Sequence, residues 1–184
     1  LKSESEFKVS MAYKDGKVVE ANLERAIHWL KKAASHKHPD AAMELHRYYL
    51  KNGLKHTADI YLEMAAYNGN NLARIALGMK IIQSLDNIKS QKELTIKINQ
   101  AHDLLMKAYE SGDFMAAGQI GRLYHKFAEN DSDMQKAVKW YLIGAKNGDR
   151  FSCSMLSICY KNGWGIEKNL EKSKFYEELA KKAD

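Results

Sequence analysis

The side chains best suited to metal chemistry are two histidines that stand two residues apart. His36 and His38 lie in a predicted turn that also holds Pro39 and Asp40. Imidazole nitrogens are good zinc ligands, but a structural zinc site needs four ligands at defined spacings. No cysteine pair or carboxylate cluster accompanies these histidines at such a spacing, and the other five histidines lie on predicted helices at unrelated positions. We therefore expect no metal site and no cofactor.

The candidate nucleophiles are Cys153 and Cys159, six residues apart in one predicted helix. Six residues rise about 9 Å along a helix axis, which exceeds the reach of a disulfide bond. We interpret both as buried free thiols. A cysteine–histidine arrangement with His125 is geometrically conceivable, but no serine, cysteine or threonine has a neighbouring base in a recognisable motif. The sequence therefore predicts no catalytic residues and a protein that is not an enzyme.

The elements that position these residues are predicted to be helices throughout. The 184 residues include one proline, 11 glycines, 45% apolar and 28% charged side chains. So few helix breakers favour an all-α protein with a sizeable core, and no apolar run is long enough to span a membrane. The net charge of +6 comes from lysines scattered among acids, which is typical of a solvated surface. Binding to nucleic acid or to an anionic surface remains an alternative that this pattern disfavours.

A repeat runs along the whole chain. One helix of each repeat opens on a small residue, at Ala26, Ala58, Ala101, Ala137 and Ser173. A bulky residue follows three positions later and an alanine seven positions later, except in the fourth repeat, where Gly144 interrupts the series. Offsets of three and seven place these residues on one helical face. The glycine that follows, as at Gly148, is typical of a helix end.

The other helix of each repeat, which comes first, has its own apolar marker, at Val9, Leu45, Leu77, Ile120 and Leu156. Glycines are predicted to end these first helices, at Gly16, Gly53 and Gly163. Asn or Asp side chains are predicted to cap the helices that follow, at Asn22, Asp133 and Asn169. The fourth repeat departs from the pattern, because it has AENDSD (128–133) where the inter-helix glycine is expected.

These patterns predict five helix pairs in one domain that spans residues 1–184. The approximate bounds of the pairs are 1–37, 38–69, 70–112, 113–148 and 149–184. No single pair can bury its apolar face alone, so the core forms where neighbouring pairs stack. The expected fold class is all-α, an α/α solenoid of about five stacked helix-turn-helix repeats.

The repeat resembles the Sel-1-like repeat, a relative of the tetratricopeptide repeat. The matching motifs are the turn Gly163-Trp164-Gly165-Ile166, the helix start Lys136-Ala137-Val138-Lys139-Trp140-Tyr141, and ARIALG at 73–78. The resemblance covers essentially all of the chain. It implies a right-handed α/α solenoid that serves as an adaptor or binding scaffold, usually without catalysis.

In related solenoids the first helix of each pair lines a concave face that receives the partner. Positions two and five residues from each apolar marker are predicted to face this groove, and Lys14 and Gly118 are among them. Most of these positions are apolar, which is typical of an interface rather than of a solvated surface. The predicted partner-binding residues are Met43, Arg47, Leu50, Leu72, Ile75, Met79, Ile82, Met115, Arg122, His125, Phe151 and Ile158. Burial of these side chains between helices is the competing interpretation.

We therefore expect a non-catalytic module that binds a protein or peptide partner in its groove. Two roles fit equally, an immunity or inhibitor protein for a secreted toxic effector and a regulatory adaptor. The alternatives are a nucleic-acid or anionic-surface binding protein and a cell-wall-directed, hydrolase-like activity. A leader removed before Leu1 would place the chain in a bacterial periplasm, which we favour over the cytoplasm.

Overall fold

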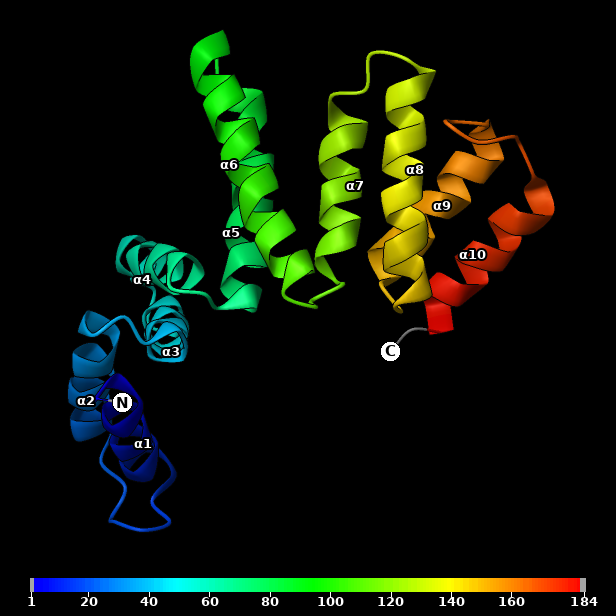
Figure 1. Cartoon of the computed structure of the whole chain (residues 1–184). Helices are drawn as coiled ribbons and strands as arrows, with labels where there is room; N and C mark the ends of the chain where they lie inside the picture. Colours follow the sequence, from blue (N-terminus) through cyan, green and yellow to red (C-terminus); the bar gives the residue numbers. More distant parts are fainter. Residues whose placement is uncertain (1, 183–184) are drawn as a thin grey trace. The chain divides into compact units, whose positions relative to one another are not determined.

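The computed structural model describes residues 2–182, and none of them lies in a β-strand. They form ten α-helices and one short 3-10 helix (Figure 1). The helices are α1 (Lys2–Asp15), α2 (Leu23–Ser35), α3 (Pro39–Lys51), α4 (Lys55–Tyr67), α5 (Asn71–Ser84), α6 (Gln91–Glu110), α7 (Ala116–Lys126), α8 (Asp131–Lys146), α9 (Arg150–Asn162) and α10 (Leu170–Lys182), with the 3-10 helix η1 (Leu85–Asn87) between α5 and α6. The all-α prediction and the helix-pair repeat are confirmed.

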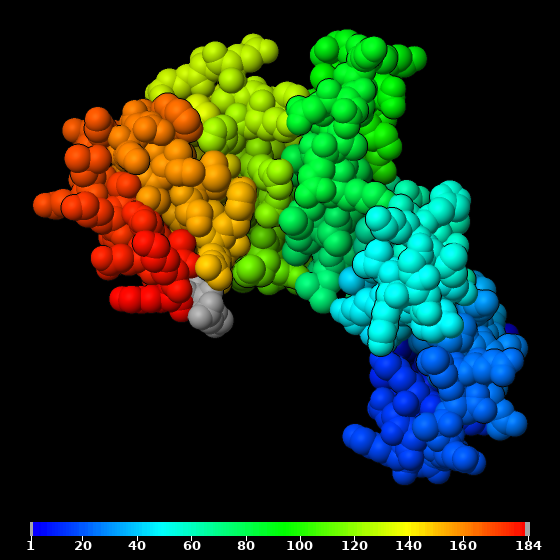
Figure 2. Space-filling view, turned by 180° about the vertical axis from the view of Figure 1, so that it is seen from behind, coloured from blue at the N-terminus to red at the C-terminus, as the bar shows by residue number. Residues whose placement is uncertain are grey.

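Contacts divide the chain into an N-terminal unit (1–77) and a C-terminal unit (78–184). In the N-terminal unit α1 packs against α2, α2 against α3, and α3 against α4. In the C-terminal unit α6 packs against α7, α7 against α8, α8 against α9, and α9 against α10. The space-filling view shows α8, α9 and α10, coloured yellow to red, packed side by side (Figure 2). From α1 to α4, and from α6 to α10, each helix therefore packs against the next one along the chain, as expected of stacked helix pairs.

The helix starts follow local capping chemistry. The side chains of Asn22 and Asn169 accept the backbone N–H of the residue three positions on, each at 2.9 Å, as predicted. The prediction for Asp133 is wrong, because α8 begins at Asp131 and its cap is Asn130. The Asn130 side chain accepts the Asp133 N–H at 3.1 Å. Acids in this first turn also favour the earlier start, because they complement the helix dipole.

The turn between α9 and α10 shows why its glycines are needed. Gly163 ends α9 in the left-handed region with φ 77°, which confirms the predicted helix end. Gly165 also has a positive φ, and a Cβ built on it would overlap the backbone of Met134. The Gly163-Trp164-Gly165 motif therefore lets the chain turn and lie directly against α8.

The core lies on the faces that the repeat predicts, with one shift. Four of the five apolar markers are buried, at Leu45, Leu77, Ile120 and Leu156. Val9 is instead 37% exposed, and Ser10 takes its place with no exposed surface. The helix α1 is turned by one residue because its Glu6 carboxylate is buried against Nδ1 of His36, at 2.6 Å, in the turn after α2.

A joint of small and polar residues fixes α9 against α7 and α8. Asp149 is buried and accepts hydrogen bonds from both the backbone N–H, at 3.0 Å, and the hydroxyl of Ser152. A Cβ on Gly118 would overlap the Asp149 carboxylate, and one on Gly144 would overlap Ser152. The interruption of the alanine series at Gly144 is therefore a packing requirement of the next repeat.

We expect Gly118→Ala to destabilise the fold by about 1–3 kcal/mol, because the added methyl must displace a buried hydrogen-bonded pair. The matched control is Ser154→Ala, 36 residues later at the same repeat position but exposed to solvent. Thermal unfolding followed by circular dichroism measures both. Equal melting temperatures for the two variants would contradict the role assigned to the joint.

Both cysteines are free and buried, as predicted. Burial raises the pKa of the Cys153 thiol, with a further contribution from Asp149, and raises that of Cys159 to about 11. The thiolate is the reactive form. We therefore expect a thiol-specific chromogenic disulfide reagent at pH 8 to leave the native chain essentially unlabelled and to modify both cysteines once denaturant is added. Rapid labelling of the native chain would contradict this packing.

Candidate partner-binding surface

The predicted partner-binding residues all lie on or next to odd-numbered helices. Helix α3 carries Met43, Arg47 and Leu50, and α5 carries Leu72, Ile75, Met79 and Ile82. Met115 directly precedes α7, which holds Arg122 and His125, and α9 holds Phe151 and Ile158. The two units each present their own part of this set, so each is described separately.

Burial separates these residues into three groups. The exposed ones are Arg47, Leu50, Leu72, Met115 and Ile158. The half-buried ones are Met43, Ile75, Met79, Arg122, His125 and Phe151. Ile82 is only 1% exposed and is part of the core, so the expectation that it faces a groove is wrong. The last turn of α5 is buried around Ile81, Ile82 and Leu85, where the chain continues into η1.

In the N-terminal unit two residues predicted to face the groove, Lys14 and Arg47, form ion pairs with the same carboxylate. Glu44 of α3 accepts the Lys14 ammonium of α1 at 2.5 Å and the Arg47 guanidinium at 2.6 Å. Burial alone would raise the pKa of Glu44, but the hydrogen bonds from both cations outweigh it and lower that pKa. Glu44, which the sequence analysis did not single out, thus holds one cation of α1 and one of its own helix α3 in place.

Arg47 also lines a hollow that combines aliphatic with charged side chains. The hollow encloses about 360 Å³ between α2 and α3, and its lining includes Leu23, Ile27 and Tyr48. Leu23 is exposed although it is aliphatic. The sequence analysis missed this hollow because four of its nine lining residues come from α2, an even-numbered helix.

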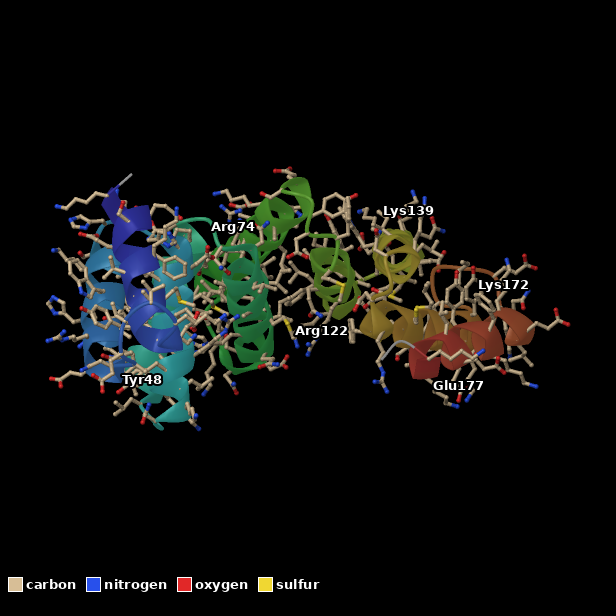
Figure 3. All side chains as sticks on the ribbon, turned by 90° about the horizontal axis from the view of Figure 1, so that it is seen from below. Tyr48, Arg74, Arg122, Lys139, Lys172 and Glu177 are labelled. Atoms are coloured by element: carbon tan, nitrogen blue, oxygen red, sulfur yellow. The ribbon has the colours of Figure 1, made fainter. Side chains whose placement is uncertain are left out.

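In the C-terminal unit Arg122 and Phe151 come together from α7 and α9. The guanidinium carbon lies over the phenyl ring, 5.9 Å from its centroid, a geometry that favours a cation–π contact. Ile158 lies on the same helix two turns after Phe151, and its side chain is 40% exposed. The labelled side chains show Arg122 on one side of this unit and Lys139 of α8 on the other (Figure 3).

His125 is a packing residue at the end of α7. Its Nδ1 lies 3.3 Å from the Tyr141 hydroxyl, and its ring meets the edge of Trp164 at 5.9 Å between centroids. Burial lowers the pKa of this imidazole below its ordinary value, so the neutral form is favoured. His125 therefore presents an aromatic surface near the α9–α10 turn rather than a charge at physiological pH.

The paired histidines of the sequence analysis bind carboxylates of their own chain. His36 contacts Glu6 at 2.6 Å, and Nε2 of His38 contacts Glu4 at 3.0 Å. Within residues 2–182 no group of three or more His, Cys, Asp or Glu side chains is arranged to hold a metal ion. No helix in this part of the chain combines the length and apolar character needed to cross a membrane.

Comparison with known proteins identifies the repeat. The Sel1 repeat family matches residues 3–38, 131–149 and 151–184. These three stretches of the chain are Sel1 repeats. The resemblance inferred from the turn and helix motifs is thereby confirmed.

Solved structures share the α/α solenoid fold of this Sel1-repeat chain. A Sel1 repeat protein from Oxalobacter formigenes superposes over 99% of the chain and 74% of its own, with a TM-score of 0.78 and 25% identity. The Escherichia coli protective antigen c5321, described as an SLR fold, gives a TM-score of 0.70 at 20% identity over 97% of the chain and 38% of its own. The immunity protein Pa5087 of Pseudomonas aeruginosa gives 0.55 at 20% identity, over 98% and 68%.

Curated relatives match part of the chain more closely in sequence. DAP3-binding cell death enhancer 1 is 42% identical over 82 residues in Rattus norvegicus and 40% identical in Mus musculus. The matched stretch is 44% of this chain and 16% of each relative. The Sel1-repeat chain thus corresponds to a small part of these relatives.

The lowered pKa of His125 predicts a pH-dependent stability. In the unfolded chain the His125 imidazole takes up a proton with a pKa near the ordinary value of 6.5. In the folded chain burial lowers this pKa, so the imidazole is protonated only at a lower pH. Stability from this site is therefore complete above pH 6.5 and is lost as the pH falls towards the folded pKa. We expect His125→Gln to flatten the fall in melting temperature between pH 8 and pH 5. The exposed His28→Gln control should keep the wild-type slope, and identical slopes in all three proteins would refute this.

Proposed function

We propose that this Sel1-repeat chain is a non-catalytic protein that binds a protein or peptide partner through the faces of its odd-numbered helices. The observation that carries the proposal is the meeting of Arg122 with Phe151, together with the exposed side chains of Met115, just before α7, and Ile158 of α9. Arginine, aromatic and methionine side chains are enriched at protein interfaces, where a few of them contribute most of the affinity.

The chemistry of this surface favours a protein partner over a small ligand or a membrane. Exposed apolar side chains beside a cation–π pair give a partner a wide apolar contact area. They provide few hydrogen-bonding groups that point to one place, as a small-ligand site would need. Sel1 repeats generally serve as interaction modules. Among the relatives, DAP3-binding cell death enhancer 1 is named for binding to DAP3.

Two finer roles follow from a protein partner. One is an immunity or inhibitor protein that caps a secreted toxic effector, and the solved immunity protein Pa5087 shares the fold. The other is a regulatory adaptor. The two roles differ in what the partner is, so identification of the partner distinguishes them.

The test is affinity capture from the parent organism with three immobilised forms of the chain. The double variant Arg122→Glu/Ile158→Glu should reduce recovery of a stoichiometric partner at least about tenfold, because two interface residues of the hot-spot type are reversed or made polar. Lys139→Glu, on the opposite side of the C-terminal unit, serves as the charge control and should retain the partner.

Equal recovery by the double variant would contradict the proposed face. Nuclease treatment and a salt series belong in the same experiment. Recovery that disappears after nuclease treatment, or falls steeply between low and physiological salt, would assign the chain to nucleic acid and overturn a protein partner.

A further inference from the structure

The C-terminal unit contains two equivalent junctions, each formed by the segment that joins two paired helices and the earlier helix beside which that segment runs. Its helices repeat with a step of 36 residues, so Ile120 of α7 corresponds to Leu156 of α9, and Ala137 of α8 to Ser173 of α10. Residues 127–133 of the fourth repeat then correspond, without insertion or deletion, to residues 163–169 of the fifth. The two segments have equal length but different structures.

In the fifth repeat the segment covers the first turn of α8. Gly165 lies against the backbone of Met134, and its N–H donates to Oδ1 of Asp131 at 3.2 Å. Ile166 packs against the core cluster that contains Val138 and Tyr160. Those two residues are only 3% and 6% exposed, so this junction is closed.

In the fourth repeat the same stretch leaves the junction open. Because Asn130 starts α8 early, the connection from α7 contains only residues 127–130. A hollow of about 380 Å³ remains between α6 and α7, lined by Ile98, Asn99, His102, Leu123, Tyr124, Phe127 and Asp133. Figure 2 shows the green α6 and the yellow-green α7–α8 connection reaching the surface at the same edge of this unit.

The walls of the open hollow match those of the closed junction position by position. Ile98 corresponds to Met134, His102 to Val138, and Tyr124 to Tyr160. His102 and Tyr124 are half-buried, whereas their counterparts are buried. The hollow is therefore the uncovered form of a site that the chain fills with its own turn one repeat later.

The N-terminal unit also combines a short connection between paired helices with a hollow. The connection from α3 to α4 is residues 52–54, shorter than any other between paired helices in residues 2–182. A hollow lies on α2, the helix before this pair, and it is lined by Leu23, Glu24, Ile27, His28 and Lys31 together with Tyr48 of α3. Leu23 and Ile27 hold the repeat positions of Ile98 and His102. A short connection thus leaves a hollow in both units.

We propose that the hollow between α6 and α7 binds a glycine-containing peptide turn of a partner, which places an aliphatic side chain against Ile98 and Tyr124. The turn would sit as Gly165 and Ile166 sit in the next junction. This inference rests on the proposed function in that the partner is a protein or peptide. A volume of about 380 Å³ lies in the range of small binding pockets and accommodates an aliphatic side chain with its turn.

The recognition chemistry follows from the closed junction. A residue in the place of Gly165 must lie directly on the helix backbone, which excludes a Cβ. Thr95 holds the position of Asp131, and its hydroxyl donates to the Gln91 carbonyl at 3.0 Å while its lone pairs can accept an N–H from the turn. The Asp133 carboxylate in the lining is already paired with the Lys136 ammonium at 2.9 Å, so the apolar contacts of the turn carry the recognition.

The chain's own turn supplies the probe. A synthetic peptide of residues 161–170, Lys-Asn-Gly-Trp-Gly-Ile-Glu-Lys-Asn-Leu, carries the turn and a basic residue two positions after Ile166. Titration into the ¹⁵N-labelled full chain should shift the backbone amides of Ile98, His102 and Tyr124. The same peptide with Ile166→Asp should bind at least about tenfold more weakly, because a charge cannot enter the apolar hollow without losing its hydration.

Two variants on one helix give the matched control. Ile98→Lys places a charge inside the hollow and should abolish the shifts, whereas Ile96→Lys changes a 56% exposed residue outside it and should leave them unchanged. Exchange of residues 127–133 for the sequence of 163–169 should close the hollow and also abolish peptide binding. In each variant the amide spectrum reports whether the chain is folded.

The proposal is overturned if about 1 mM peptide causes no shifts at the hollow, or if Ile96→Lys and Ile98→Lys weaken binding equally. Peptide binding that survives the segment exchange would also overturn it. A dimer of the peptide-free chain that Ile98→Lys dissociates would assign the hollow to a second copy instead. Partner capture through the Arg122 face is independent of this hollow, so either proposal can fail while the other stands.

Discussion

Close approach of neighbouring helix pairs is the constraint on which the packing of this chain depends. Where α9 meets α7 and α8, a Cβ on Gly118 or Gly144 would overlap Asp149 or Ser152. The two polar side chains are buried there because Asp149 accepts the backbone and hydroxyl hydrogen bonds of Ser152. This joint fixes how α9 sits on its neighbours. It therefore also fixes which side chains α9 shows to solvent, among them Ile158.

The sequence predicted the fold well because the helical repeat places apolar residues on one face of each helix, and that face is buried. Leu45 and Ile120 are buried where that period places them. The errors occur where a local contact overrides the period. Glu6 turns α1 towards His36, so Ser10 is buried in place of the predicted Val9. The period of apolar residues predicts which helix face is buried. It does not predict an ion pair or a helix cap that shifts one helix by a residue or its start by a turn.

The candidate surface was predictable to the extent that it lies on single helices. Leu72 and Ile158 are exposed at the expected offsets, whereas Ile82 is buried because α5 runs on into η1. Glu44 and the hollow beside Arg47 were not predictable in this way. Both depend on two helices at once, and the position of the second helix depends on packing that no single-helix pattern encodes.

The fourth and fifth repeats show that helix capping can reshape a solenoid surface without changing its period. Residues 127–133 and 163–169 have equal length. In the fourth repeat Asn130 and the acids after it start α8 early, so residues 131–133 become helix and α6 is left uncovered. In the fifth, the left-handed conformations of Gly163 and Gly165 keep the chain out of a helix until Asn169 caps α10, so the segment covers α8. Two connections of equal length thus leave an apolar site open in one repeat and cover it in the next, while the buried faces of the flanking helices keep their spacing.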